Sequence, residues 1–329
     1  MDQEASGDIM ASYLVTGGAG FIGSHLAEEL LRRGHRVRIA DNFVTGKRQN
    51  LMHLKGAEVL EGDLADTAFA ERATSGMDYV LHQAAIPSVP RSVEDPWASN
   101  RSNIDATLSV LIGARKAGVK RVVYAASSSA YGNTPTLPKR EEMPPSPRSP
   151  YALQKLVGEQ YCKLFTELYG LPTVCTRYFN VFGPRQDPGS PYSGVISLFT
   201  SALLAGRRPV IYGDGSQTRD FTYVANVVSG VLLACDAPNV SGEMMNLATG
   251  GRISLNDLVR VLNGIIGCNV APVYRAPRAG DVHDSQADIT KARTMLGYEP
   301  IVSFEDGLAA TVRWCGSTTP VEIRQEPAA

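Results

Sequence analysis

The sequence predicts an α/β fold: a doubly wound parallel sheet with a smaller C-terminal lobe. Short, almost continuously apolar runs alternate with helical patterns through the first half of the chain, which is typical of parallel strands covered by helices on both faces. Past residue 180 this alternation stops, and proline and glycine cluster over 183–194. The expected strands cover 13–16, 36–41, 57–60, 78–83, 119–126 and 172–176, and the expected helices cover 21–32, 66–74, 98–117 and 151–169.

The first strand leads into a glycine-rich turn. Gly17, Gly20 and Gly23 lie three residues apart, between an apolar run and an amphipathic helix. Such a turn lets backbone approach a diphosphate, which binds the unpaired N–H groups of the helix N-terminus. A tight turn without a ligand could carry the same glycines, so the next strand matters. It ends in Asp41, whose carboxylate can accept both ribose hydroxyls and would repel a 2′-phosphate. We therefore expect NAD rather than NADP, although the basic pair at 47–48 could hold that phosphate.

In a Rossmann-like sheet, ligands bind at the carboxyl ends of the strands. Asp63, after the third strand, can accept from an adenine amino group, and the small Ala84 and Ala85, after the fourth, let a cofactor pack closely. Three serines at 127–129 follow the fifth strand, although a serine triplet could equally be an ordinary loop. Neighbouring positions complete the expected cofactor site: Phe21, Ile22, Asn42, Gly46, Leu64 and Gln83.

Composition and charge argue against several classes of protein. The chain has 329 residues, enough for one large or two modest domains, and its formal net charge of −1 gives no reason to expect nucleic acid or an anionic membrane as partner. No apolar run reaches the roughly 18 residues of a membrane span, and the polar first residues do not resemble a signal peptide. The scattered cysteines and histidines predict neither disulfides nor a metal site, so we expect reduced thiols in a cytoplasmic protein.

The two lobes are not expected to divide at a single point. Residues 244–248 are apolar enough to form a strand that rejoins the main sheet after the lobe has begun. The expected parts are a flexible N-terminus over 1–10, a cofactor domain over 11–180 rejoined by about 218–250, a substrate lobe mainly over 181–316, and a flexible tail over 317–329.

Tyr151 and Lys155 form a pattern that indicates acid–base catalysis. Their spacing places the phenol and the ammonium side by side on one helix face. A free tyrosine, with a pKa of about 10, is a poor base at neutral pH, but a nearby cation and the positive nicotinamide ring stabilise the phenolate. The pair is common by chance, so its position after a serine cluster and a dinucleotide turn is what makes it specific.

Together with the glycine turn, the serine cluster and Tyr131-Gly132, this pair resembles the extended short-chain dehydrogenase/reductases. Three further stretches resemble the nucleotide-sugar 4-epimerases, and the resemblance runs over about 12–315: 177–185, 219–224 and 278–281. Two stretches are most similar to bacterial UDP-N-acetylhexosamine 4-epimerases: 125–132 and 185–188.

This resemblance implies a mechanism. Tyr151 would take the proton from the sugar 4-hydroxyl as hydride passes from C4 to NAD⁺, and the 4-keto sugar would turn over and receive the hydride on its other face. Lys155 would hold the nicotinamide ribose and tune Tyr151. A serine hydroxyl would hydrogen-bond the 4-oxygen, and we favour Ser128, with Ser127 close behind.

The resemblance also implies substrate contacts. Asn180 and Arg219 would bind the UDP diphosphate, while Tyr212 would lie against the uracil ring with Val195 near its edge. The remaining implied residues are Arg278 on the phosphate side, Asp281 on the ribose hydroxyls, Asn103 and Tyr178 on the cofactor side, and Ser88, Ser128 and Ser129 on the substrate side.

Ser285 bears on the choice of sugar. In the related epimerases the residue four positions after the Arg-x-Gly-Asp aspartate borders the C2 substituent, and a bulky tyrosine there excludes N-acetyl groups. The small serine predicts space for UDP-GlcNAc and UDP-GalNAc and does not forbid UDP-Glc and UDP-Gal. The alternative is that Ser285 lies on a surface turn.

Sister enzymes on the same scaffold carry acids that this chain lacks. Dehydratases have an Asp-Glu pair beside the catalytic hydroxyl, and UDP-glucuronate decarboxylases have a glutamate, whereas residues 128–130 here are Ser-Ser-Ala. Simple epimerisation is therefore favoured. A UDP-glucuronate 4-epimerase stays open, and so does a catalytically silent NAD-binding regulator, although a regulator would usually have lost Tyr151 or Lys155.

We expect a homodimer that pairs through a four-helix bundle. The expected helices over 98–117 and 151–169 carry apolar residues on more than one face, so each needs a second partner besides its own sheet. These residues are Leu108, Val110, Leu111 and Ile112 in the first helix, and Leu156, Val157, Leu164 and Phe165 in the second.

Overall fold

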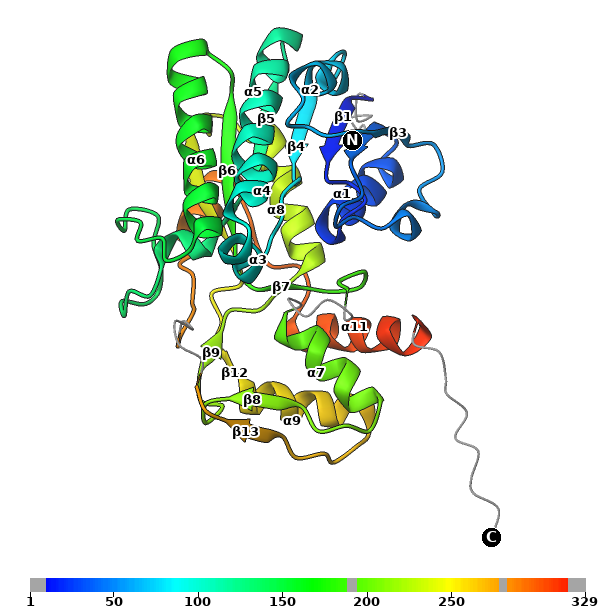
Figure 1. The fold of residues 1–329 in the computed structure, drawn as a ribbon, viewed down its shortest axis with the longest axis vertical. Helices are drawn as coiled ribbons and strands as arrows, with labels where there is room; N and C mark the ends of the chain where they lie inside the picture. Colours follow the sequence, from blue (N-terminus) through cyan, green and yellow to red (C-terminus); the bar gives the residue numbers. More distant parts are fainter. Residues whose placement is uncertain (1–9, 188–193, 278–282, 319–329) are drawn as a thin grey trace, which may run out of the picture.

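A seven-stranded parallel sheet forms the centre of the molecule (Figure 1). The computed structural model describes residues 10–187, 194–277 and 283–318. The strand order is β11-β6-β5-β4-β1-β2-β3, and every neighbouring pair is parallel, which confirms the predicted fold class. The strands are β1 (Ser12–Thr16), β2 (Arg36–Asp41), β3 (Glu58–Glu61), β4 (Tyr79–His82), β5 (Arg121–Ser127), β6 (Thr173–Tyr178) and β11 (Glu243–Leu247).

Helices cover both faces of this sheet because its strands are apolar on both sides. The consecutive residues Leu14 and Val15 of β1 point into different cores, one on each face. One face is covered by α1 (Phe21–Arg32), α8 (Val224–Asp236) and α10 (Thr290–Leu296). The other is covered by α2 (Thr67–Thr74), α5 (Ala106–Ala117) and α6 (Pro150–Tyr169).

The helix expected over 98–117 is interrupted. α4 (Pro96–Asn100) begins after the N-cap Asp95, and a single π-helical turn (Arg101–Asp105) separates it from α5. A short helix, α3 (Val89–Glu94), precedes α4. The turn contains Asn103, which is fully buried, and such turns are frequent at functional sites.

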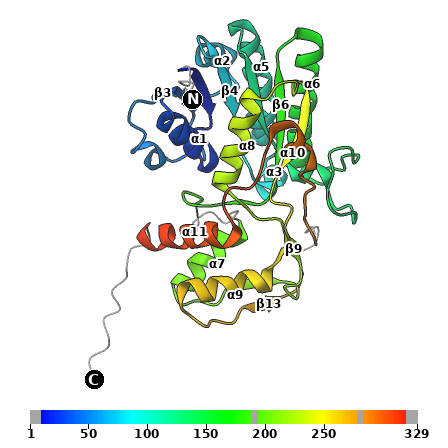
Figure 2. The same cartoon turned by 180° about the vertical axis from the view of Figure 1, so that it is seen from behind.

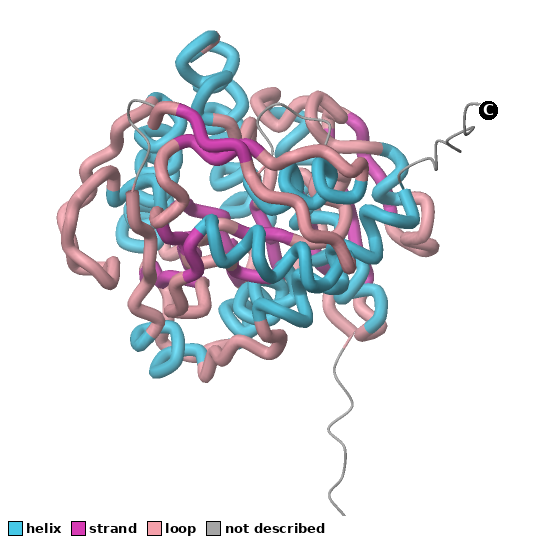
Figure 3. The backbone as a smooth tube through the Cα atoms, turned by 90° about the horizontal axis from the view of Figure 1, so that it is seen from below, coloured by secondary structure: helices cyan, strands magenta, loops and turns pink. Residues whose placement is uncertain are grey.

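A smaller lobe lies at the carboxyl end of the sheet. The chain enters it directly after β6, where β7 (Val181–Phe182) begins. The lobe has a core of its own, and Figures 1 and 2 show it on the same side of the sheet in both views. Figure 3 looks at the molecule from the side of this lobe. Its elements are α7 (Val195–Leu204), β8 (Val210–Tyr212), β9 (Thr218–Arg219), β10 (Thr222–Tyr223), β12 (Ile253–Ser254), α9 (Leu255–Ile266), β13 (Val273–Arg275) and α11 (Phe304–Thr318).

The strand expected over 244–248 is β11, and it pairs with β6 along its whole length after the chain has passed through part of the lobe. The order of the strands reverses between β1 and β4, and this reversal marks the crevice where ligands bind in such sheets. Within the described ranges, no helix combines the length and the hydrophobicity needed to cross a bilayer. All five cysteines are free thiols, and no metal-binding group of three side chains forms among the described residues.

Candidate active site

The glycine turn packs directly against the end of β4. Gly17 has a φ of +63°, and a side chain there would come within 2.8 Å of the Ala84 backbone. Gly20 precedes α1 as its N-cap, with Phe21 and Ile22 in the first turn, and no described side chain caps that turn. The free N–H groups and the positive helix end therefore suit a phosphate.

Asp41 is held rigidly at the end of β2. Its carboxylate accepts the backbone N–H groups of Ala19 at 2.9 Å and Phe43 at 2.8 Å. Burial raises the pKa of Asp41, and these backbone hydrogen bonds oppose that shift. A side chain at Gly46 would lie 2.9 Å from both carboxylate oxygens, so glycine leaves the approach to Asp41 clear.

Serine side chains position the start of α6. Ser149 is its N-cap and accepts the N–H of Ala152 at 3.1 Å, ahead of a proline in the first helical position. The N–H of Tyr151 donates to the Ser92 hydroxyl of α3 at 3.1 Å. Nothing in the sequence pointed to Ser92. The Ser-Pro pair at the start of α6 is a typical helix N-terminus and could have identified Ser149 as the N-cap.

The Tyr151 phenol interacts with the Ser127 hydroxyl, which lies close enough to affect its pKa. Burial raises the pKa of Tyr151, and the Ser127 hydroxyl, which stabilises the phenolate, opposes that rise. Ser127 Oγ accepts both the N–H of Ser129 at 3.2 Å and its hydroxyl at 2.8 Å, which leaves the Ser127 proton for the phenol. Ser128, the favoured candidate from the sequence, has no side-chain hydrogen bond to the described residues, and we therefore propose Ser127 as the serine that acts with Tyr151.

Lys155 lies one helical turn beyond Tyr151 and is almost fully buried, with 4% of its surface exposed. Its Nζ donates to the Ala125 carbonyl at 2.8 Å and lies 5.0 Å from the centre of the Tyr124 ring. Burial lowers the pKa of Lys155 to about 8, and the negative charge of Glu159 opposes that shift. The lysine thus remains mostly protonated at neutral pH, one helical turn from Tyr151, with its ammonium held against the carbonyl of β5.

A buried ion pair anchors the same helix to the sheet. Glu159 accepts two hydrogen bonds from Arg177 of β6, at 2.8 and 2.7 Å. The guanidinium also lies 4.4 Å from the ring centre of Tyr131, whose hydroxyl donates to Asn246 of β11 at 2.7 Å. Helix α6, the serine loop and two strands are therefore joined through one polar network.

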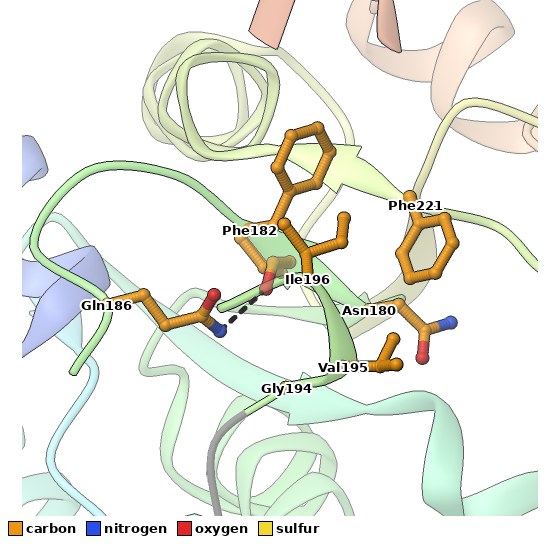
Figure 4. Close-up of a pocket in the computed structure, with 8 residues that line it drawn as sticks. Asn180, Phe182, Gln186, Gly194, Val195, Ile196 and Phe221 are labelled. Atoms are coloured by element: carbon orange, nitrogen blue, oxygen red, sulfur yellow. Dashed lines mark hydrogen bonds between the residues drawn. The ribbon is translucent and has the colours of Figure 1, made fainter. Parts of the chain in front are cut away.

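The lobe side of the crevice contains a pocket of about 260 Å³ that is partly open to solvent. Figure 4 shows apolar side chains gathered beside the amides of Asn180 and Gln186. Gln186 Nε2 donates to the Val181 carbonyl at 3.1 Å, and its Oε1 accepts from Ser197 at 2.7 Å, so this side chain fixes one wall. The lining residues are Asn180, Val181, Phe182, Gln186, Gly194, Val195, Ile196 and Phe221.

Asn180 also connects the pocket to Ser285. Its Nδ2 donates to the Asp220 carbonyl at 3.2 Å and lies 3.5 Å from Ser285 Oγ, so the structure brings both predicted residues to one place. Arg219 adjoins them and donates to the carbonyls of Thr218 and His283. Tyr212 ends β8, and Ser88 is the N-cap of α3. Arg278 and Asp281 lie outside the described residues.

Residues 13–248 match the family model described as the NAD dependent epimerase/dehydratase family. The chain belongs to this family. Its NAD-dependent chemistry accords with the glycine turn and Asp41, and NAD is the cofactor, as the sequence predicted.

Named relatives of this epimerase/dehydratase chain cover almost its whole length. A UDP-glucose 4-epimerase of Mycolicibacterium smegmatis is 40% identical, over 92% of this chain and 97% of the relative. A UDP-N-acetylglucosamine 4-epimerase from Methanobrevibacter ruminantium, solved with UDP-N-acetylmuramic acid, is 40% identical with a TM-score of 0.90, over 94% of this chain and 99% of that one. A UDP-glucuronic acid 4-epimerase from Bacillus cereus, solved with UDP-glucuronic acid and NAD, is 32% identical with a TM-score of 0.87, over 94% and 100%.

The expected cofactor side of this epimerase/dehydratase fits a dinucleotide in one further respect. Gln83 Oε1 accepts the Tyr178 hydroxyl at 3.1 Å, but its buried Nε2 has no partner among the described residues. A buried donor without an acceptor costs free energy, which a carbonyl or hydroxyl of a bound cofactor would recover. The neighbouring Ala84 and Ala85 are half-buried and small, so they leave room beside this amide.

Other expected cofactor residues already have partners within the chain. Asp63 forms an ion pair with Arg101 at 3.0 Å, and Leu64 is buried in the core beneath α2. Asn42 is exposed and accepts the N–H of Val44. The Asn103 side chain is buried and hydrogen-bonded within the protein, so we propose that it supports the cofactor side through the loop after β4.

Proposed function

We propose that this chain is a nucleotide-sugar 4-epimerase that inverts C4 of a UDP-sugar through a transient 4-keto intermediate. The observation that carries the proposal is the group of Ser127, Tyr151 and the buried Lys155, in a chain whose glycine turn packs against the end of β4. Bound NAD supplies the redox chemistry, because it can accept a hydride from the sugar and return it.

The residues of the chain handle the proton. Tyr151 accepts the proton of the 4-hydroxyl and gives it back when the 4-keto group is reduced. The Ser127 hydroxyl stabilises the phenolate form, so it lowers the cost of creating a base at neutral pH. We propose that the protonated Lys155, one helical turn further along α6, adds to this effect. Since one phenol serves both directions, an additional acid is unnecessary.

The absence of a carboxylate in the serine loop favours epimerisation over elimination or decarboxylation. Ser128, Ser129 and Ala130 fill the short helical turn that follows β5, and the turn ends at Tyr131. Removal of a hydroxyl or a carboxylate from the sugar needs an acid–base group near the reacting carbon. The phenol and the serine hydroxyl are sufficient for a reversible oxidation at C4.

Tyr151→Phe is the test of this reaction. The variant should lose turnover by roughly 10²- to 10⁴-fold, because the proton acceptor is removed. Its affinity for the UDP-sugar should stay within a few-fold, as measured by calorimetry on the NAD-bound protein. Near-normal turnover in this variant would remove Tyr151 from the mechanism.

The sugar that we propose is an N-acetylhexosamine, with UDP-GlcNAc and UDP-GalNAc as the pair that interconverts and the plain hexoses UDP-Glc and UDP-Gal as further substrates. The position of Ser285 beside Asn180 supports this choice, because a small side chain lies next to a residue that lines the pocket. Incubation with UDP-GlcNAc, UDP-Glc and UDP-glucuronate separately, followed by chromatography, compares the three directly. Turnover of UDP-glucuronate alone would replace our choice with the glucuronate epimerase.

Ser285→Tyr probes the same wall. Tyrosine adds a ring that a packed pocket cannot absorb without strain of roughly 1–3 kcal/mol. We expect kcat/KM for UDP-GlcNAc to fall at least tenfold, as about 1.4 kcal/mol implies, while UDP-Glc is spared. Equal effects on the two sugars would show that the N-acetyl group lies elsewhere.

We also propose that the protein is a homodimer in which α5 and α6 form a four-helix bundle with their counterparts. Leu164 is 44% exposed on α6, and Leu153 and Leu168 of the same helix are also exposed, which leaves an apolar surface to cover. Val110, Leu111 and Phe165 instead belong to the core of the chain itself and are unavailable to a partner. A monomeric mass by light scattering at micromolar concentration would refute the dimer.

A further inference from the structure

A continuous chain of buried hydrogen bonds runs from the glycine turn to the catalytic helix. Thr16 Oγ1 lies 2.7 Å from His82 Nδ1, and His82 Nε2 lies 3.0 Å from Thr107 Oγ1. The Thr107 hydroxyl donates to the Asn103 carbonyl at 2.6 Å, and Asn103 Nδ2 donates to Gln154 Oε1 at 2.8 Å. All five side chains are buried, and the imidazole is 1% exposed.

The other hydrogen bonds of Thr16 and Thr107 determine which atom is the donor in each bond to His82. Thr16 Oγ1 already accepts the N–H groups of Gln83 at 3.1 Å and Ala84 at 3.2 Å, so its own proton goes to His82 Nδ1. The proton of Thr107 goes to a carbonyl, so its oxygen accepts from His82 Nε2. The imidazole is therefore neutral and carries its hydrogen on Nε2. Burial, followed by the nearby Lys155 charge, lowers the pKa of His82 to about 3, in agreement with this geometry.

This series of hydrogen bonds holds the loop that follows β4 at two points. Thr16 holds the N–H groups of Gln83 and Ala84, and Asn103 Oδ1 holds the N–H of Ile86 at 2.8 Å. This loop packs against Gly17 on one side, while Asn103 binds the helix of Tyr151 on the other. Asn103 lies on the same buried helix face as Ser99 and Thr107, which places it within reach of both partners.

We propose that His82 is a positioning residue that holds the dinucleotide turn and the catalytic helix in one fixed geometry, by linking Thr16 to Thr107. In the described part of the chain His82 is hydrogen-bonded to Thr16 and Thr107, and it is not among the residues that line the pocket. Without its two hydrogen bonds, the Thr16 proton and the Thr107 oxygen lose their partners in a buried site, and the loop over 83–86 is free to shift. The cofactor would then be held less firmly and would be misaligned with Tyr151. This inference rests on the proposed function only for its effect on turnover, because the effect on cofactor retention is independent of the sugar.

Two matched variants separate positioning from simple stabilisation. Thr107 on α5 and Thr74 on α2 are both buried helical threonines whose hydroxyls donate to the carbonyl four residues earlier, at 2.6 and 2.9 Å. Only Thr107 also receives His82. Thr107→Val and Thr74→Val therefore remove the same local hydrogen bond, and they differ in the link to the imidazole.

Cofactor retention is measured on the full-length protein loaded with NADH, diluted into excess NAD, by the loss of bound NADH fluorescence. We expect NADH to leave Thr107→Val about tenfold faster than wild type, the equivalent of about 1.4 kcal/mol, which is the size of one well-formed buried hydrogen bond. Thr74→Val should stay within about twofold of wild type, and Thr107→Ser, which keeps the hydroxyl, should restore retention. Equal release rates in the two valine variants would overturn the proposal.

Turnover supplies the second measurement. In Thr107→Val, kcat should fall about tenfold while KM for the UDP-sugar stays within about twofold, because the substrate lobe is untouched. A rise in KM with unchanged kcat would contradict a role in alignment. The third measurement is the nitrogen resonances of His82 in histidine-labelled holoenzyme, which should report a neutral ring protonated on Nε2 from about pH 5 to pH 9. A ring that titrates in this range, or one protonated on Nδ1, would also refute the inference.

Discussion

Glu159→Gln should be among the most destabilising conservative substitutions in this protein. Glu159 and Arg177 form a two-point ion pair, and their side chains are only 5% and 3% exposed. Glutamine keeps the shape but removes the charge, so the buried guanidinium loses its compensating carboxylate. Arg177 Nη1 already lacks a hydrogen-bond partner among the described residues, so few other hydrogen bonds can compensate for the loss of the carboxylate.

The size of the effect follows from burial. Breaking a buried pair by removing one partner costs about 3–5 kcal/mol, because an uncompensated charge remains in a medium of low dielectric constant. At the roughly 2 °C per kcal/mol expected for a chain of this size, the melting temperature should fall by about 6–10 °C. Differential scanning calorimetry of the protein without added ligand measures both quantities.

Glu299→Gln is the matched control. Arg293 and Glu299 make the same two-point contact, at 2.9 Å for both hydrogen-bonded atom pairs, but their side chains are 50% and 63% exposed. Exposed pairs contribute about 0–1 kcal/mol, so this variant should melt within about 2 °C of wild type. Equal shifts in the two variants would refute the argument that burial decides the contribution of the Glu159 pair.

Three further predictions concern the catalytic and cofactor groups. Ser127→Ala should lower kcat at least tenfold and Ser128→Ala should not, since only Ser127 is bonded to the phenol; the opposite order would restore the preference for Ser128. For the lysine, Lys155→Met should change how stability depends on pH. The folded-state pKa of Lys155 is about 8 against 10.5 for the free side chain, so the unfolded state binds more protons between these values and stability rises with pH there. The methionine variant should lack this contribution of roughly 3 kcal/mol in denaturation series at pH 7 and pH 11, and identical pH profiles would contradict it. Asp41→Ala should weaken NAD binding and relax discrimination against NADP; an unchanged cofactor preference would make the acid purely structural.

Much of the sheet was predictable because its signals are local. The apolar runs gave β1 to β6 to within a few residues, and the glycine turn and Asp41 mark the ends of two of these strands. The lobe was not predictable in the same way. Strands such as β9 and β12 contain two residues each, too few for any periodicity, and their pairing depends on distant parts of the chain.

Details of the site depend on tertiary structure. Ser127 is the last residue of β5, and Ser128 is the first residue of the following turn. The backbone changes direction between them, so which of the two hydroxyls faces Tyr151 could not be predicted from the sequence. Ser92 binds the Tyr151 N–H from 59 residues away. The π-helical turn at Asn103 was read as continuous helix, because its residues have the same apolar spacing as the helix around it.

The return of the chain through β11 has a consequence for how the protein can be divided. β11 covers one side of β6, and α8 and α10 cover a face of the sheet, yet all three elements come after the chain has entered the lobe. A fragment that stops near residue 180 would leave β6 as a bare edge and one apolar face uncovered, a template for aggregation. The cofactor domain is therefore discontinuous in sequence and cannot be transferred to another protein as one stretch of chain. Part of the substrate lobe lies between its segments and has to be transferred with it.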